Sequence, residues 1–190
     1  MKKILVSIAA LLLVLTNATA QKDTLHILFK GVQVNGPEDE FTRQLIDKQY
    51  TCSNGQVNGK FAGYDVSLHM EKTKVSGMVY MVAATLHPSS WKQAKTDYII
   101  FKANMSLKYG QPASCTEIFT GAYRDGDGYE LKALSEDACR FCSEWNTTLG
   151  RILIEINYVN RAAAVTIIYE DAINAKLNTQ EKTNIFLEDL

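Results

Sequence analysis

The sequence is poor in the residues that build metal centres and nucleic-acid-binding surfaces. It has 3 histidines and 4 cysteines among 190 residues, and 20 lysines and arginines against 21 aspartates and glutamates. No basic stripe occurs, which argues against a nucleic-acid partner. The histidines stand apart, and a single Cys-x-x-Cys pair is present where a zinc knuckle needs two such pairs. We therefore expect no metal and no cofactor.

Fingerprints of common catalytic sites are missing as well. Serine-hydrolase, P-loop and dinucleotide-binding motifs are absent. The stretch DGDGYELKALSE places Asp125, Asp127 and Glu136 at calcium-loop positions 1, 3 and 12, but Tyr129 replaces an oxygen ligand and Glu130 replaces the required glycine. A solvated turn explains this stretch better. We assign no catalytic residue.

Long apolar runs are also scarce, apart from one at the start of the chain. MKKILVSIAALLLVLTNATA has two lysines, an apolar run of about a dozen residues, and Ala18-Thr19-Ala20 as a small-x-small cleavage site. A membrane-spanning helix needs about 20 apolar residues, so this run is too short to span. The pattern predicts a signal peptide over 1–20, a single domain over 21–190, and a periplasmic or extracellular location.

Strand and helix patterns alternate along the rest of the chain. Alternating apolar residues predict strands in LHILFKGVQV, GYDVSLHME, KVSGMVYMVAATL, GRILIEINYV and AAVTIIYED, and a hairpin in which CTEIFTGAY and YELKAL flank the turn RDGDG. Cap and stop signals predict helices at about 37–48, 91–109 and 172–187. We expect the last helix to have an apolar side made by Ile173, Leu177 and Phe186.

Neighbouring strands are joined by short turns, so hairpins should dominate the fold. We predict an α+β protein with a mainly antiparallel sheet and two or three helices packed on one face. Strand, helix and hairpin follow each other twice, which indicates a duplicated β-α-β-β unit. The helix at 91–109 has an aromatic stripe that is typical of a core face, with a ligand groove as the alternative; the stripe consists of Trp91, Ala94, Tyr98, Phe101 and Met105.

Several stretches carry a resemblance to known proteins. FKGVQVNGPEDEFTRQL, GKFAGYDVSL, SSW before a helix ending in LKYGQP, and VTIIYEDAIN resemble a family of small uncharacterised exported proteins of Bacteroidetes bacteria. The likeness covers most of the chain after residue 20, and its motifs are structural glycines, prolines and aromatics, so it implies no catalytic residues. The helix–KYGxP–sheet pattern is also loosely similar to outer-membrane assembly lipoproteins and β-lactamase-inhibitor proteins, which are binding modules.

The same resemblance bears on a modification near the start of the predicted domain. Asp23-Thr24-Leu25 matches the short acceptor that Bacteroidetes bacteria O-glycosylate, with Thr24 as the modified residue. The alternative is an ordinary tripeptide that leads into the first strand.

CRFC, with Cys139 and Cys142, is the one stretch with the spacing of a redox pair. On the first turn of a helix the two sulfurs could meet and react. On a strand they would lie about 10 Å apart on opposite faces, beyond the separation of about 7 Å that a disulfide allows. The resemblance favours the strand. Each thiol would then pair with Cys52 or Cys115, and an oxidising compartment favours at least one structural disulfide, with Cys115 as a partner.

Export and the lack of a catalytic constellation favour one functional class. We expect a non-enzymatic binding module of the cell envelope, whose partner is a protein or an envelope component held by the sheet face or the loops. The alternative is a periplasmic thiol-disulfide oxidoreductase that uses Cys139 and Cys142.

Overall fold

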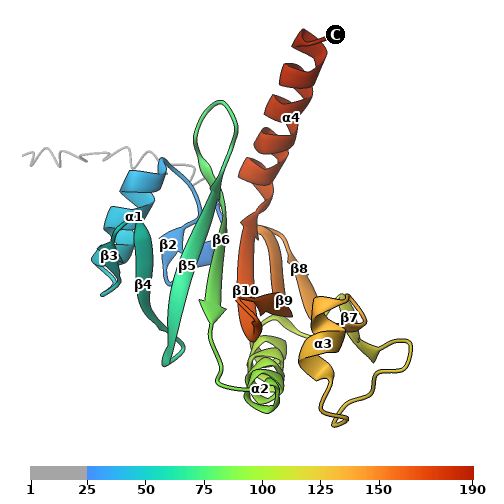
Figure 1. Ribbon diagram of the computed structural model, residues 1–190. Helices are drawn as coiled ribbons and strands as arrows, with labels where there is room; N and C mark the ends of the chain where they lie inside the picture. The colour runs from blue at the N-terminus through green and yellow to red at the C-terminus, as the bar shows by residue number, and fades with distance from the viewer. Residues whose placement is uncertain (1–24) are drawn as a thin grey trace, which may run out of the picture.

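The computed structural model describes residues 25–190 (Figure 1). The predicted signal peptide over 1–20 and Thr24 lie outside this range. The helices are α1 (Glu38–Ile46), α2 (Trp91–Tyr109), α3 (Glu130–Ser135) and α4 (Ala172–Glu188). The strands are β1 (Leu28–Phe29), β2 (Val32–Gln33), β3 (Thr51–Ser53), β4 (Gln56–Phe61), β5 (Tyr64–Lys72), β6 (Val79–Leu86), β7 (Ser114–Phe119), β8 (Cys139–Thr147), β9 (Gly150–Val159) and β10 (Ala162–Asp171).

Eight of these strands form one antiparallel sheet in the order β3-β4-β5-β6-β10-β9-β8-β7. The pairing of β6 with β10 joins two four-stranded halves, and a helix precedes each half along the chain. The predicted α+β class is confirmed. The arrangement that recurs is a helix followed by four sequential antiparallel strands, rather than β-α-β-β, and in the second half α3 is inserted between the first and second of these strands.

One face of the sheet is buried beneath α1, α2 and the small β1–β2 hairpin. Ile152, Ile154 and Ile156 of β9 point into this core, as their alternation predicts, whereas Tyr158 at the end of the strand is exposed. The stripe on α2 is buried as well. A single connected core contains residues from both halves of the sheet. The opposite face carries polar side chains such as His69 and Glu155.

The stretch YELKAL forms α3 instead of the predicted strand. Adjacent Ala133 and Leu134 are both buried, which a one-sided strand does not allow. The Asp127 carboxylate accepts a hydrogen bond from the Tyr129 N–H at 2.8 Å, and Glu130 accepts one from the Gly126 N–H at 2.8 Å. These acidic side chains order the turn into the helix. The partner of β7 is therefore β8.

The stretch LHILFKGVQV turns back on itself instead of forming one strand. β1 and β2 pair across a tight turn at Lys30 and Gly31, whose φ angles are 54° and 79°. Glycine adopts such left-handed angles without steric penalty, whereas lysine does so at a cost. The hairpin closes over the core through Phe29, which is fully buried.

Helix α4 extends beyond the end of the sheet (Figure 1), and its buried side is polar. The Asn174 side-chain amide donates to the Val34 carbonyl at 3.2 Å and to the Val79 carbonyl at 3.0 Å. Of the apolar side expected from Ile173, Leu177 and Phe186, Leu177 is half-buried whereas Ile173 and Phe186 are exposed, so these residues do not form the buried side of the helix. The surface that meets the buried side of α4 offers polar groups, among them the backbone carbonyls of Val34 and Val79 and the Ser76 hydroxyl, and these select polar partners.

Candidate functional site

The CRFC stretch lies on β8, so the strand alternative is correct. Cys139 points toward the core face with Phe141, and Cys142 points toward the opposite face. Both thiols are buried, with exposures of 5% and 8%. An extended backbone keeps their sulfurs from meeting.

The surroundings of these thiols also suppress their reactivity. Burial raises the pKa of Cys139 to about 11, and nearby carboxylates act in the same direction. Burial likewise raises the pKa of Cys142, assisted by Glu155 and opposed by a hydrogen bond from Arg140. Thiol–disulfide catalysis needs a lowered thiol pKa and an accessible sulfur. The geometry therefore gives the oxidoreductase alternative no support.

All four cysteines are free thiols in the structure, which does not contain the expected disulfide. Cys115 and Cys139 face the same side of the β7–β8 ladder four positions apart, a separation of roughly 13 Å. Cys142 points to the other face, and Cys52 lies on β3 at the opposite edge of the sheet. The sheet holds the sulfurs apart.

Cys115 belongs to a polar cluster between β7 and α2. Its thiol lies 3.5 Å from the Glu117 carboxylate, and the buried Ser143 hydroxyl donates to its sulfur at 3.4 Å. Lys102 forms an ion pair with Glu117 and approaches the sulfur at 4.0 Å. Although burial opposes it, this lysine and its neighbours lower the pKa of Glu117. The cluster is satisfied internally and lies outside the three cavities described next.

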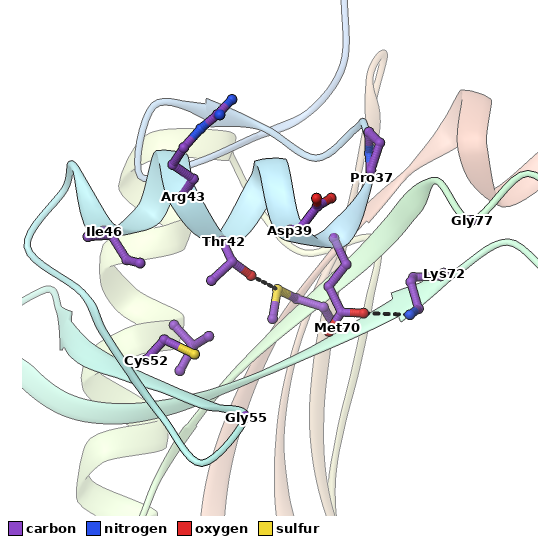
Figure 2. Close-up of a pocket in the computed structure, with 12 residues that line it drawn as sticks. Pro37, Asp39, Thr42, Arg43, Ile46, Cys52, Gly55, Met70, Lys72 and Gly77 are labelled. Atoms are coloured by element: carbon purple, nitrogen blue, oxygen red, sulfur yellow. Dashed lines mark hydrogen bonds and ion pairs between the residues drawn. The ribbon is translucent and has the colours of Figure 1, made fainter.

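A first cavity, the α1 groove, lies between α1, the β3–β4 turn and β5 and has a volume of about 650 Å³ (Figure 2). Its floor includes Cys52 and Met70, and the Thr42 hydroxyl donates to the Met70 sulfur at 3.9 Å. Lys72 pairs with Glu38 at 2.6 Å, so charges at the mouth are already neutralised.

A second cavity, the CRFC cleft, lies beside α3 and the ends of β8 and β9, with a volume of about 680 Å³. Both CRFC thiols contribute to its lining. Its charged lining residues are Asp137, Arg140 and Glu155, which sum to one negative charge. Arg140 and Glu155 both act on the Cys142 thiol, so the polar groups of the cleft interact with one another.

The third cavity, which we call the aromatic pocket, has a volume of about 580 Å³. It opens between the β1–β2 turn, the β4–β5 turn and the C-terminal half of α2, with β10 behind them. Its lining comprises Leu28, Lys30, Gly31, Phe61, Ala62, Tyr64, Ile100, Phe101, Asn104, Met105, Lys108 and Tyr169.

The floor of the aromatic pocket is built from stacked rings. The Phe61 and Phe101 rings stack with centroids 6.0 Å apart, and the Tyr64 ring lies 5.1 Å from that of Phe101. Phe61, Phe101 and Tyr169 are buried, whereas Ile100 at the mouth is exposed. The residues of the α2 stripe therefore differ in role. Trp91, Ala94 and Tyr98 belong to the core alone, whereas Phe101 and Met105 are buried and also line the aromatic pocket.

Charge separates the aromatic pocket from the other two cavities. Lys30 and Lys108 line it, and its lining contains no carboxylate. Within residues 25–190, neither lysine forms an ion pair, whereas Lys60, Lys72 and Lys102 do. The sequence offered a ligand groove only as an alternative for the α2 stripe, which supplies Phe101 and Met105. It did not indicate the two lysines, Phe61 or Tyr169, because the lining comes from four separate segments and no local pattern joins them.

Neither the comparison with protein-family models nor the searches of curated proteins and of solved structures found a match for this chain. Over the described range, no helix has both the length and the apolar character that a membrane crossing requires. In the same range, no group of three or more histidine, cysteine or acidic side chains is placed to hold a metal ion.

Proposed function

We propose that this chain is an exported, non-enzymatic binding protein of the cell envelope, and that it holds an apolar small molecule in the aromatic pocket. The observation that carries the proposal is a cavity with a buried aromatic floor and an open mouth. Ligand sites in proteins have volumes of about 300–1,000 Å³ and are lined by apolar and aromatic side chains with a few polar groups. Asn104, Tyr169 and the two lysines are those polar groups.

The exposed part of the lining supports binding over a purely structural role. Leu28 and Ile100 leave 51% and 40% of their surfaces open beside buried rings. A ligand between them would remove this apolar surface from water, at about 25 cal/mol for each Å². The concave shape of the pocket favours a small molecule over a macromolecular partner.

The uncharged dye N-phenyl-1-naphthylamine tests the proposal, because its fluorescence rises in apolar surroundings. We expect saturable binding of one dye per chain. Ile100→Ser should weaken binding about fivefold, because the substitution removes part of one wall. Ile99→Ser is the matched control, since Ile99 is a similarly exposed neighbour on α2 that does not line the pocket. No saturable binding, or equal loss in both variants, would refute the proposed site.

Export is tested by fractionating a bacterium that expresses the full chain. The N-terminus of the protein from the envelope or the medium should be Gln21. Recovery only from the cytosol, still beginning at Met1, would contradict export.

A further inference from the structure

We propose that the aromatic pocket selects an amphiphile with an acyl chain and one anionic head, and that Lys30 and Lys108 hold the head at the mouth. This inference rests on the proposed function, because it names the ligand class of the same site. The acyl chain lies on Phe61 and Phe101, and the head stays near solvent.

The two lysines approach the mouth from separate elements. Lys30 belongs to the β1–β2 turn and Lys108 to the last turn of α2, and both are exposed, whereas the floor is buried. Two cations with no carboxylate between them make the mouth attractive to a single anion. The α1 groove and the CRFC cleft lack this property, because acidic side chains line both.

Lys30 is an unfavourable residue for the backbone position that it occupies. Its φ of 54° lies in the left-handed region, where a lysine costs about 1 kcal/mol and asparagine or glycine is preferred. The next residue of the turn, Gly31, has the expected type. The turn gives a lysine no local advantage over asparagine, and its charge lies at the pocket mouth, where an anion would use it.

Lys108 has a second explanation, which the experiment must separate from ligand binding. Cations in the last turn of a helix are favoured by the helix dipole, and the Lys108 ammonium also lies 4.9 Å from the centre of the Tyr109 ring. Both contacts leave the ammonium exposed and able to approach an anion. The dipole explanation does not apply to Lys30, which lies on a turn.

Tyr169 adds a hydrogen-bond donor inside the pocket. Its hydroxyl donates to the Met105 sulfur at 3.9 Å, and a thioether is a weak acceptor. Burial, together with nearby Tyr109, holds the pKa of this phenol far above its ordinary value, so the group stays protonated and able to donate. An ester or carboxyl oxygen of a ligand would be a better acceptor than the sulfur.

The test compares ligands that share a decyl chain and differ in the head. Decanoate, decyl phosphate, decanol and decyltrimethylammonium are titrated against the bound uncharged dye, below their micelle concentrations. We expect at least one of the two anions to bind about tenfold more tightly than the cation, with decanol between them. The better anion identifies the head as carboxylate or phosphate. High salt should weaken anion binding, since the Debye length falls from about 10 Å at 0.1 M to about 3 Å at 1 M.

Matched variants assign the selectivity to the two lysines. Lys30→Asn with Lys108→Gln removes both charges. Asparagine suits the left-handed turn, which offsets the lost dipole and ring contacts of Lys108, so the variant should fold about as stably as the parent. It should weaken anion binding about tenfold and leave dye binding within about twofold. Lys74→Gln with Lys92→Gln removes two charges outside the pocket and should change neither.

The outcomes separate this inference from the proposed function. If the parent protein shows no saturable dye binding, the proposed function and the inference are refuted together. Dye binding with equal affinity for anion and cation refutes the inference alone. Equal weakening by the two double variants also refutes it, because net charge rather than the pocket would then set the selectivity.

Discussion

The imidazole Nδ1 of His26 lies 3.0 Å from the carboxylate Oδ1 of Asp171, a residue 145 positions later in the chain. The same carboxylate accepts the Ile27 N–H at 3.0 Å and the Asn174 N–H at 2.9 Å. Asp171 therefore caps α4 and ties the first described segment to the end of β10. His26 and Asp171 are both buried, and the carboxylate is the polar partner of the His26 ring.

Asp171→Ala should destabilise the protein by roughly 3 kcal/mol or more, because it leaves three buried donors without their acceptor. His26→Ala should cost clearly less, since both backbone bonds to the carboxylate remain. Urea unfolding measures both changes. Asp65→Ala is the control: it breaks an exposed ion pair with Lys60 and should change the free energy of unfolding by less than about 1 kcal/mol. Equal losses in the three variants would contradict this role.

Glu181 makes the anchoring of α4 dependent on pH. Its carboxylate accepts hydrogen bonds from the Ser76 hydroxyl at 2.6 Å and from the Val75 N–H at 2.6 Å. The Ser76 bond and the backbone bonds lower the pKa of Glu181, although burial opposes the shift. A folded pKa below the unfolded one means that the stabilisation is present above about pH 4.3 and is lost as pH falls through the folded pKa.

Glu181→Gln should therefore be less stable than the parent at neutral pH, and the difference should shrink in acid. Thermal unfolding across the acidic range measures this difference, and hydrogen exchange of the Val75 and Ser76 amides reports it locally. Glu188→Gln near the exposed end of α4 is the control. If the difference in stability between Glu181→Gln and the parent protein stays constant from neutral pH to acid, the ionised Glu181 carboxylate does not stabilise the anchoring of α4.

The four thiols should react at very different rates with iodoacetamide. Cys52 and Cys115 are exposed and should be alkylated in the native protein, whereas Cys139 and Cys142 should resist until urea unfolds it. At about pH 8 the raised pKa of both buried thiols leaves little thiolate, and the fraction rises only as pH approaches the folded pKa. Peptide mass spectrometry measures the labelling. Fast native labelling of Cys139, or its disulfide with Cys142, would revive the oxidoreductase alternative.

Gly59 is required because the Tyr50 ring lies directly over it. A Cβ at this position would lie 2.4 Å from Tyr50 Cδ1, while the Tyr50 hydroxyl donates to the Lys60 carbonyl at 3.1 Å. Gly59→Ala should therefore destabilise the protein by roughly 1–3 kcal/mol in urea unfolding. The same substitution in a Tyr50→Ala background should cost much less, since the clash is removed. An unchanged penalty in that background would disprove the steric explanation.

Sequence patterns predicted those elements whose signals are local and repeated. The alternation in GRILIEINYV and the cap and stop signals of α2 correspond to β9 and α2. The strand predicted for YELKAL was wrong, because six residues carry too little periodicity to separate helix from strand. The hydrogen bonds that Asp127 and Glu130 accept in the preceding turn favour the start of a helix. For α4, the apolar side was misleading because the helix packs against polar groups, backbone carbonyls among them.

By itself, the sequence determined the antiparallel α+β class, because period-two alternation and short turns are properties of adjacent residues. For CRFC the sequence left a helical turn and a strand open, and the structure decided for the strand. Only the tertiary structure decided that Lys30 and Lys108 would line the same cavity over Phe61 and Phe101. It likewise brought His26 to Asp171. These contacts join residues far apart in the chain, and the order of strands in the sheet, which no local pattern encodes, sets which of them meet.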